Sequence, residues 1–316
     1  MTAWRAARLA PVLALLAACA VAPPDGPAPE TPERDAPQET RPAPQAGRSE
    51  ESRALAAHYA RLQDDLLARG LLRTDGGGPD TRYGARDLLR NFERIAFYEE
   101  YVRGGGLRRA ADTPGRLKRW PGPVRITAEF GASVPPAQRT RDENSLRAYT
   151  ARLARVTGHP ITYTEDGSAN FHVLFMGEDD RARALRRIRA LVPDIDANAL
   201  GIIRDLPRAV HCLVFAFSED PGGQRYDQAI AFIRAEHPDL MRRSCIHEEV
   251  AQGLGLANDS PRARPSIFND DDEFALLTSH DEMLLRMLYD PRLEAGMTLD
   301  EARPVLRRIL AERTGS

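Results

Sequence analysis

The chain has a single lysine, Lys118, only three cysteines, and no apolar run of membrane length after the short one near its N-terminus. Arginine carries nearly all of the positive charge, which reflects genome composition more than function. The formal net charge is −2 at pH 7, and acids and arginines are interspersed. The sequence therefore has no basic stripe for nucleic acid and no polybasic segment for anionic lipid. We expect no nucleic-acid partner.

The N-terminus has the pattern of a lipoprotein signal. Arginines precede an apolar run, Leu9–Ala18, which is too short to span a membrane as a stable helix. The run ends in Leu16-Ala17-Ala18-Cys19, which resembles a lipobox. We expect residues 1–18 to be a signal peptide and Cys19 to carry lipid, its membrane partner; an ordinary cleaved secretion signal is the alternative. Alanine at position 20, directly after Cys19, resembles the pattern of lipoproteins sorted to the outer rather than the inner membrane. The expected location is therefore the cell envelope, facing the periplasm.

Two segments precede the main domain. Residues 19–49 are rich in Pro, Ala, Glu, Thr and Gln, a composition that predicts a disordered tether. Residues 50–106 contain apolar residues at helical spacing in Glu51–Leu72 and Ala85–Tyr101, each followed by a glycine-rich break. We expect a helical hairpin that caps the domain or shields part of its cleft.

Residues 120–316 have the pattern of one α+β domain. Period-two and helical spacing predict strands at Val124–Phe130, Ile161–Thr164, Asn170–Met176 and His211–Phe217, and helices at Ser145–Val156 and Arg181–Leu191. A further apolar segment, Ile230–Arg234, leads towards a motif-bearing helix.

If Cys19 is acylated, Cys212 and Cys245 remain in a compartment that permits disulfides. A bridge between them closes a loop of 33 residues and stabilises the fold by roughly 3–4 kcal/mol. It also joins the motif helix to the sheet. Two reduced thiols, or one reactive thiol, are the alternatives.

The motif lies in Ser244–Asp259. A zinc protease motif that begins at His247 needs a second histidine four residues later, and that position is alanine. In the register that starts one residue later, Glu248 and Gln252 share a helix face. Gly255 can then turn the chain and bring Asn258 back towards that face.

In this register the segment resembles the extended metzincin pattern His-Glu-x-x-His-x-x-Gly-x-x-His. The general-base glutamate corresponds to Glu249 and the turn glycine to Gly255, whereas Glu248, Gln252 and Asn258 replace the three zinc histidines. Downstream, Pro265–Asn269 resembles the Met-turn with Phe268 in place of methionine, and Leu284–Tyr289 resembles the closing helix. The ensemble is similar to a family of proteobacterial lipoproteins, domain-of-unknown-function family 2927. The resemblance implies a metzincin-like α+β fold, a mixed sheet with a backing helix and the motif helix.

The replaced residues offer only oxygen donors, so zinc is not expected and any metal would be a harder divalent cation. The alternative without a metal is that they hydrogen-bond one another. Burial of Glu249 beside Glu248 would create a carboxylate pair, unless one of them is solvated. We read His247 as a structural residue at the helix start. His280 could reach the cleft, and Asn269–Glu273 is a solvated loop or, less simply, a calcium site.

Two functions remain open from the sequence. The first is a non-catalytic module that holds an envelope peptide or protein in the old substrate cleft by strand addition. The second is an atypical hydrolase that uses Glu249 as general base, with a non-zinc metal or none. The loss of all three histidines favours the binding module, without a cofactor.

Overall fold

The computed structural model describes residues 47–99, 113–219 and 223–314. The predicted lipidation site Cys19, the signal peptide, nearly all of the tether and the end of the predicted hairpin lie outside these residues. No helix among the described ranges is both long and apolar enough to cross a membrane.

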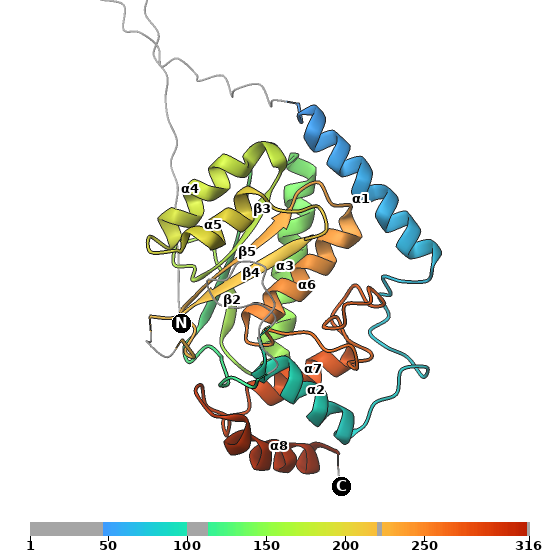
Figure 1. Ribbon diagram of the computed structural model, residues 1–316, viewed down its shortest axis with the longest axis vertical. Helices are drawn as coiled ribbons and strands as arrows, with labels where there is room; N and C mark the ends of the chain where they lie inside the picture. The colour runs from blue at the N-terminus through green and yellow to red at the C-terminus, as the bar shows by residue number, and fades with distance from the viewer. Residues whose placement is uncertain (1–46, 100–112, 220–222, 315–316) are drawn as a thin grey trace, which may run out of the picture. The chain divides into compact units, whose positions relative to one another are not determined.

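The centre of the domain is a five-stranded sheet with the order β2-β1-β3-β5-β4 (Figure 1). Four strands are parallel and β4 is antiparallel at one edge. The strands are β1 (Val124–Phe130), β2 (Ile161–Tyr163), β3 (Phe171–Met176), β4 (Cys212–Phe217) and β5 (Gln228–Arg234). The α+β class is therefore confirmed as a mixed sheet with helices.

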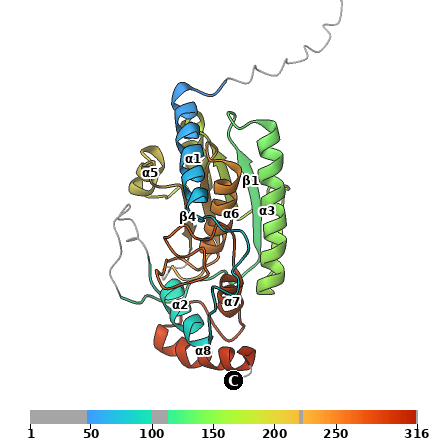
Figure 2. The same ribbon diagram turned by 90° about the vertical axis from the view of Figure 1, so that its right-hand side faces the viewer.

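Helices cover both faces of the sheet. One face packs against α3 (Pro136–Thr157) and α6 (Asp239–Gly253), and the other against α4 (Arg181–Leu191) and α5 (Ala197–Arg204) (Figures 1 and 2). The central strand β3 shows the alternation that this requires, because Val173 belongs to the first hydrophobic cluster and Leu174 to the second. All of β3 is buried, as expected for a strand covered on two sides.

The remaining helices lie beyond the sheet. They are α1 (Glu50–Ala68), α2 (Ala85–Phe97), α7 (Ser279–Leu288) and α8 (Leu299–Thr314), and a short 3₁₀ turn, η1 (Glu178–Asp180), precedes α4. Helix α2 packs with α7 and α8 at the lower end of the view in Figure 1.

The predicted hairpin of α1 and α2 is not formed. The buried side chains of α1, Leu55 and Tyr59 among them, pack with Met241 of α6 and with residues 275–276. Those of α2, including Phe92, belong to the main core. Each helix has an apolar face that could have met the other, but both find larger apolar surfaces elsewhere in the domain.

Candidate functional site

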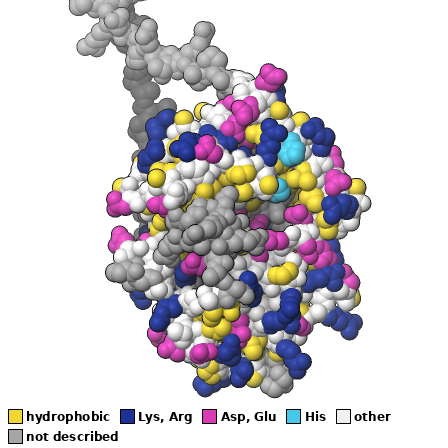
Figure 3. Space-filling view, viewed as in Figure 1, with side chains coloured by type: hydrophobic (Ala, Val, Ile, Leu, Met, Phe, Trp, Pro, Cys, Tyr) yellow, Lys and Arg dark blue, Asp and Glu magenta, His cyan; other side chains and the backbone are white. Residues whose placement is uncertain are grey.

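A cleft of about 1130 Å³ lies along β4, the edge strand of the sheet. All six residues of β4 line it, together with α6, the 191–196 segment after α4, and the loop that follows α6. In the space-filling view acidic and apolar side chains lie side by side on this face (Figure 3). The cleft is thus bounded by a sheet edge on one side and a helix on the other.

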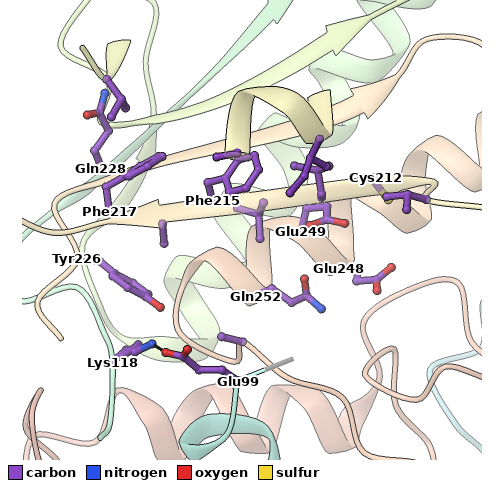
Figure 4. A pocket seen from close by; sticks show the side chains of 18 of the residues that line it. Glu99, Lys118, Cys212, Phe215, Phe217, Tyr226, Gln228, Glu248, Glu249 and Gln252 are labelled. Atoms are coloured by element: carbon purple, nitrogen blue, oxygen red, sulfur yellow. Dashed lines mark ion pairs between the residues drawn. The ribbon is translucent and has the colours of Figure 1, made fainter. Parts of the chain in front are cut away.

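The polar residues of α6 in the cleft are spaced by four. Ser244, Glu248 and Gln252 all line it, while Ile246 and Val250 on the opposite side of the helix are buried in the core. Glu248 and Gln252 extend into the space beside β4 (Figure 4). The structure therefore brings these two residues to one face, in the register read from the sequence.

Glu249 also reaches the cleft, although it follows Glu248 directly. Its side chain lines the cleft wall and the residue is only 3% exposed. Carboxylate oxygens of Glu248 and Glu249 and the sulfur of Cys212 lie within 4.8 Å of one another. Because that sulfur is bonded to Cys245, it is not available as a thiolate ligand. What remains is a pair of carboxylates, one half-exposed and one buried.

The predicted disulfide is present between Cys212 and Cys245, whose Cα atoms are 5.9 Å apart. Cys212 begins β4, and Cys245 lies in α6 one turn before Glu249. The bridge covalently ties the two walls of the cleft at one end.

Asn258 does not return to the cleft face. It is buried, and its side-chain amide donates to the carbonyl of Arg94 in α2 at 3.1 Å; the residue that lines the cleft here is Asp259. The turn itself is as expected, because Gly255 has φ +126°, and a Cβ on it would lie 2.4 Å from the carbonyl oxygen of Lys118. That approach directs the chain so that Asn258 meets α2, and the three positions equivalent to zinc ligands do not form one donor set.

His247 is structural, but the prediction that it starts the helix is wrong. Helix α6 begins at Asp239, so His247 lies in its second half. Its Nδ1 accepts a hydrogen bond from the backbone N–H of Leu277 at 2.9 Å. Its ring stacks on Tyr149 with centroids 3.9 Å apart, and burial lowers the pKa of His247 to about 3.

His280 does not reach the cleft. It is fully buried, contacts the Asn91 amide at 3.0 Å, and packs edge-on against Tyr83. Its neighbour Asp281 completes the cap of α7: the Thr278 side chain accepts from the Asp281 N–H, and the Asp281 carboxylate accepts from the Thr278 N–H. A histidine in the first turn of an amphipathic helix can face either way, and here it faces the core between α2 and α7.

The segment that resembles a Met-turn packs into the main core and is hydrogen-bonded to α7. Phe268 is fully buried in the main core, and the carboxylate of Asp281 accepts from the Ser266 hydroxyl and the Ile267 N–H. In the acidic run that follows, Glu273 forms ion pairs with Arg73 and Arg264, which lower the pKa of Glu273 together. Three residues of the 269–273 run line the cleft instead: Asn269, Asp270 and Asp272.

The far wall of the cleft was not predicted from the sequence. Lys118 and Tyr226 lie there, and Lys118 forms an ion pair with Glu99 (Figure 4). Burial lowers the pKa of Lys118 to about 8. The isolated lysine in a chain rich in arginine was the only signal available for it.

The described lining of the cleft is strongly acidic. Its basic or imidazole side chains are Lys118 and His211, whereas ten of its residues are acids: Glu99, Asp194, Asp196, Glu219, Asp227, Glu248, Glu249, Asp259, Asp270 and Asp272. Such a concave surface with charge of one sign attracts ligands of the opposite sign.

Comparison with known proteins places this domain in one family. The family model described as "Protein of unknown function (DUF2927)" matches residues 85–308, a range that includes the whole sheet, the motif helix and all of the described cleft lining. No curated protein and no solved structure matches the chain significantly. By this match over most of its length, the chain belongs to the DUF2927 family.

Proposed function

We propose that the cleft binds an extended peptide, which adds as a further strand to the outer edge of β4. The observation that carries the proposal is the position of β4. Among the described strands it has a neighbour, β5, on one side only, and all six of its residues line the cleft. An edge strand offers backbone donors and acceptors to an incoming chain.

The dimensions and charge of the cleft define the ligand. At ~3.4 Å per residue, a strand of the length of β4 pairs with a peptide of about six residues. Ser244, Glu248 and Gln252 of α6 would then face side chains on one side of the peptide. Because carboxylates predominate in the described lining, we expect the preferred peptides to be rich in arginine or lysine.

The arrangement also supports a metzincin-like origin for the domain. The order of elements, the antiparallel strand beside the motif helix and the turn at Gly255 all fit that resemblance. Replacement of the three histidines, with Asn258 turned towards α2, supports a role that does not depend on zinc. In our proposal the protein is an envelope lipoprotein, held by lipid on Cys19 and facing the periplasm.

The test is peptide binding to the chain with Cys19→Ser, measured by fluorescence anisotropy on arrays of basic, neutral and acidic seven-residue peptides. Basic peptides should bind, and N-methylation of alternate backbone nitrogens should weaken binding at least ~10-fold, because one strand-pairing edge is blocked. Hydrogen exchange of residues 212–217 should slow in the complex.

Two matched variants of α6 locate the site. Gln252→Trp fills the cleft and should abolish binding, whereas Arg243→Trp, on the exposed side of the same helix, should leave it intact. If Gln252→Trp binds as tightly as the parent, the ligand lies elsewhere and the proposal fails.

A hydrolase is the second candidate, and the Glu248–Glu249 pair favours it. Two carboxylates at this separation, one of them buried, can exchange a proton with a substrate and with water. Glu249→Gln separates the two functions. A binding module keeps its peptide affinity in this variant, whereas a hydrolase that uses Glu249 as general base loses turnover of the bound peptide while still binding it.

A further inference from the structure

The arginines of α4 fall into two groups. Arg181 forms an ion pair with Glu178 and donates to the carbonyl of Ile203 at 2.6 Å. Arg187 binds the carboxylate of Glu129 on β1, with N–O distances of 2.7 and 2.8 Å. These two side chains fasten the helix to the sheet and to α5.

The other three arginines of α4 have no such role. Arg183, Arg186 and Arg189 are exposed, and none of them has an ion pair or side-chain hydrogen bond with another described residue. Their spacing of three places them along one side of the helix. Other surface arginines, such as Arg73 and Arg264, are engaged by carboxylates, whereas the charges of these three side chains are left for a ligand.

The surrounding segment increases the positive charge. Apart from Arg181 and Arg187, whose charges Glu178 and Glu129 balance, residues 181–208 contain five arginines and three aspartates, a formal excess of +2, although the whole chain carries −2. Five arginines in all fall within residues 181–189, a basic segment that the even balance of charge over the whole sequence conceals. Folding aligns the arginines into one basic face, defined by Arg183, Arg186 and Arg189.

The basic face lies close to the start of the described domain. Asp179 in η1, immediately before α4, accepts a hydrogen bond at 2.9 Å from the N–H of Ser49, the N-cap of α1. In Figure 1 the first turns of α1 and helix α4 lie in the same upper part of the domain, and Lys and Arg side chains gather there in Figure 3. The tether predicted from the sequence joins the domain at this point.

We propose that the basic face of α4 docks on the surface of a membrane that contains anionic phospholipid. Guanidinium groups bind phosphate oxygens in a two-pronged geometry. The tether predicted over residues 19–49 would reach between roughly 30 Å as a random coil and roughly 90 Å as an extended Pro-rich chain, so a lipid on Cys19 would keep the basic face within that distance of the headgroups. Weak docking suffices under that constraint, because the binding is intramolecular.

Docking would also orient the binding cleft. Helix α4 runs directly into the 191–196 segment, which lines the cleft beside β4. A domain held by the basic face would keep that wall close to the membrane instead of rotating freely at the end of its tether. The inference does not require the peptide-binding proposal, since the arginines do not line the cleft.

The test is co-sedimentation of the full chain carrying Cys19→Ser with vesicles. Phosphatidylcholine vesicles with added phosphatidylglycerol should bind the protein more tightly than pure phosphatidylcholine, and added salt should abolish the difference. The pure phosphatidylcholine vesicles report any binding by the apolar N-terminal run. Each arginine near an anionic surface contributes about five-fold to affinity, so Arg183→Glu/Arg186→Glu/Arg189→Glu should lower binding by at least ~100-fold.

The matched control is Arg307→Glu/Arg308→Glu/Arg313→Glu on α8, which changes the net charge equally at three exposed positions. It should retain most of the binding, and thermal melts of both triple variants verify folding. Equal binding by both variants, or binding that salt does not affect, overturns the proposal. The proposal is also overturned if the protein does not respond to anionic vesicles and the α4 arginines are required only for binding an acidic protein.

Discussion

The Tyr149 hydroxyl donates a hydrogen bond at 2.8 Å to the backbone carbonyl of His247, and the two rings stack almost in parallel. Helix α3 thereby holds α6 at the turn that carries Glu248 and Glu249. The imidazole completes the arrangement by accepting the N–H of Leu277. A histidine beside the candidate site therefore positions the motif helix.

The buried imidazole makes stability depend on pH. The pKa of His247 is lowered to about 3, against ~6.5 in an unfolded chain. Between these values the unfolded chain binds a proton that the folded chain does not, so the free energy of unfolding should fall as pH drops from ~6.5 towards ~3, by roughly 5 kcal/mol in full. His247→Asn keeps an acceptor for Leu277 but does not titrate there. Urea unfolding at a series of pH values should give the variant a flatter profile than the parent; parallel profiles would contradict the assignment.

The disulfide should contribute substantially to stability. Bridging Cys212 and Cys245, 33 residues apart, restricts the unfolded chain, so Cys212→Ser/Cys245→Ser should lose about 3–4 kcal/mol. Urea midpoints measure the loss, and the parent in reductant should approach the double variant. Cys19→Ser alone serves as the control and should not change the midpoint. A reduced parent as stable as the oxidised one would show that the bridge constrains little.

Local sequence patterns predicted the elements of the sheet well. Val124–Phe130 and Arg181–Leu191 were predicted with the bounds that the structure has, because alternation and helical spacing depend only on which side of an element is buried. The shared face of Glu248 and Gln252 follows from the same rule. The eight-residue helix α5 was not predicted, since so short a segment has little periodicity.

Features that depend on tertiary contacts were not predictable in the same way. The direction of the chain after Gly255 depends on the close approach of Lys118, which lies more than a hundred residues earlier. Asn258 therefore turns to α2, and His280 packs inward against Asn91. In the same way, the apolar faces of α1 and α2 predicted that one side of each helix is buried, but they did not indicate which part of the domain each helix packs against.

Gly255 should not tolerate even alanine. A Cβ there would lie 2.4 Å from a backbone oxygen, and the residue has a positive φ, so Gly255→Ala should cost about 2–4 kcal/mol. Gly122→Ala is the matched control, because a Cβ at Gly122 meets nothing within 4 Å. Thermal denaturation should show a lower melting temperature for the first variant and little change for the second. Similar stabilities would mean that the turn has more freedom than its geometry indicates.

Lys118 offers a direct probe of the cleft, because it is the single lysine of the chain. Burial lowers the pKa of Lys118 to about 8, while the carboxylate of Glu99 opposes this effect by stabilising the ammonium form. Reductive methylation with an isotopic label gives one side-chain signal for an NMR titration. We expect a midpoint near 8 in the folded chain and near ~10.4 in denaturant.

Glu99→Gln removes the opposing carboxylate and should lower the midpoint of Lys118 further. Glu294→Gln, an exposed residue outside the cleft, should leave it unchanged. A basic peptide bound along β4 should also lower the midpoint, because added positive charge in the cleft disfavours the ammonium form. A folded midpoint near ~10.4 would instead mean that water reaches Lys118 freely, and a midpoint indifferent to a bound peptide would place that peptide away from this wall of the cleft.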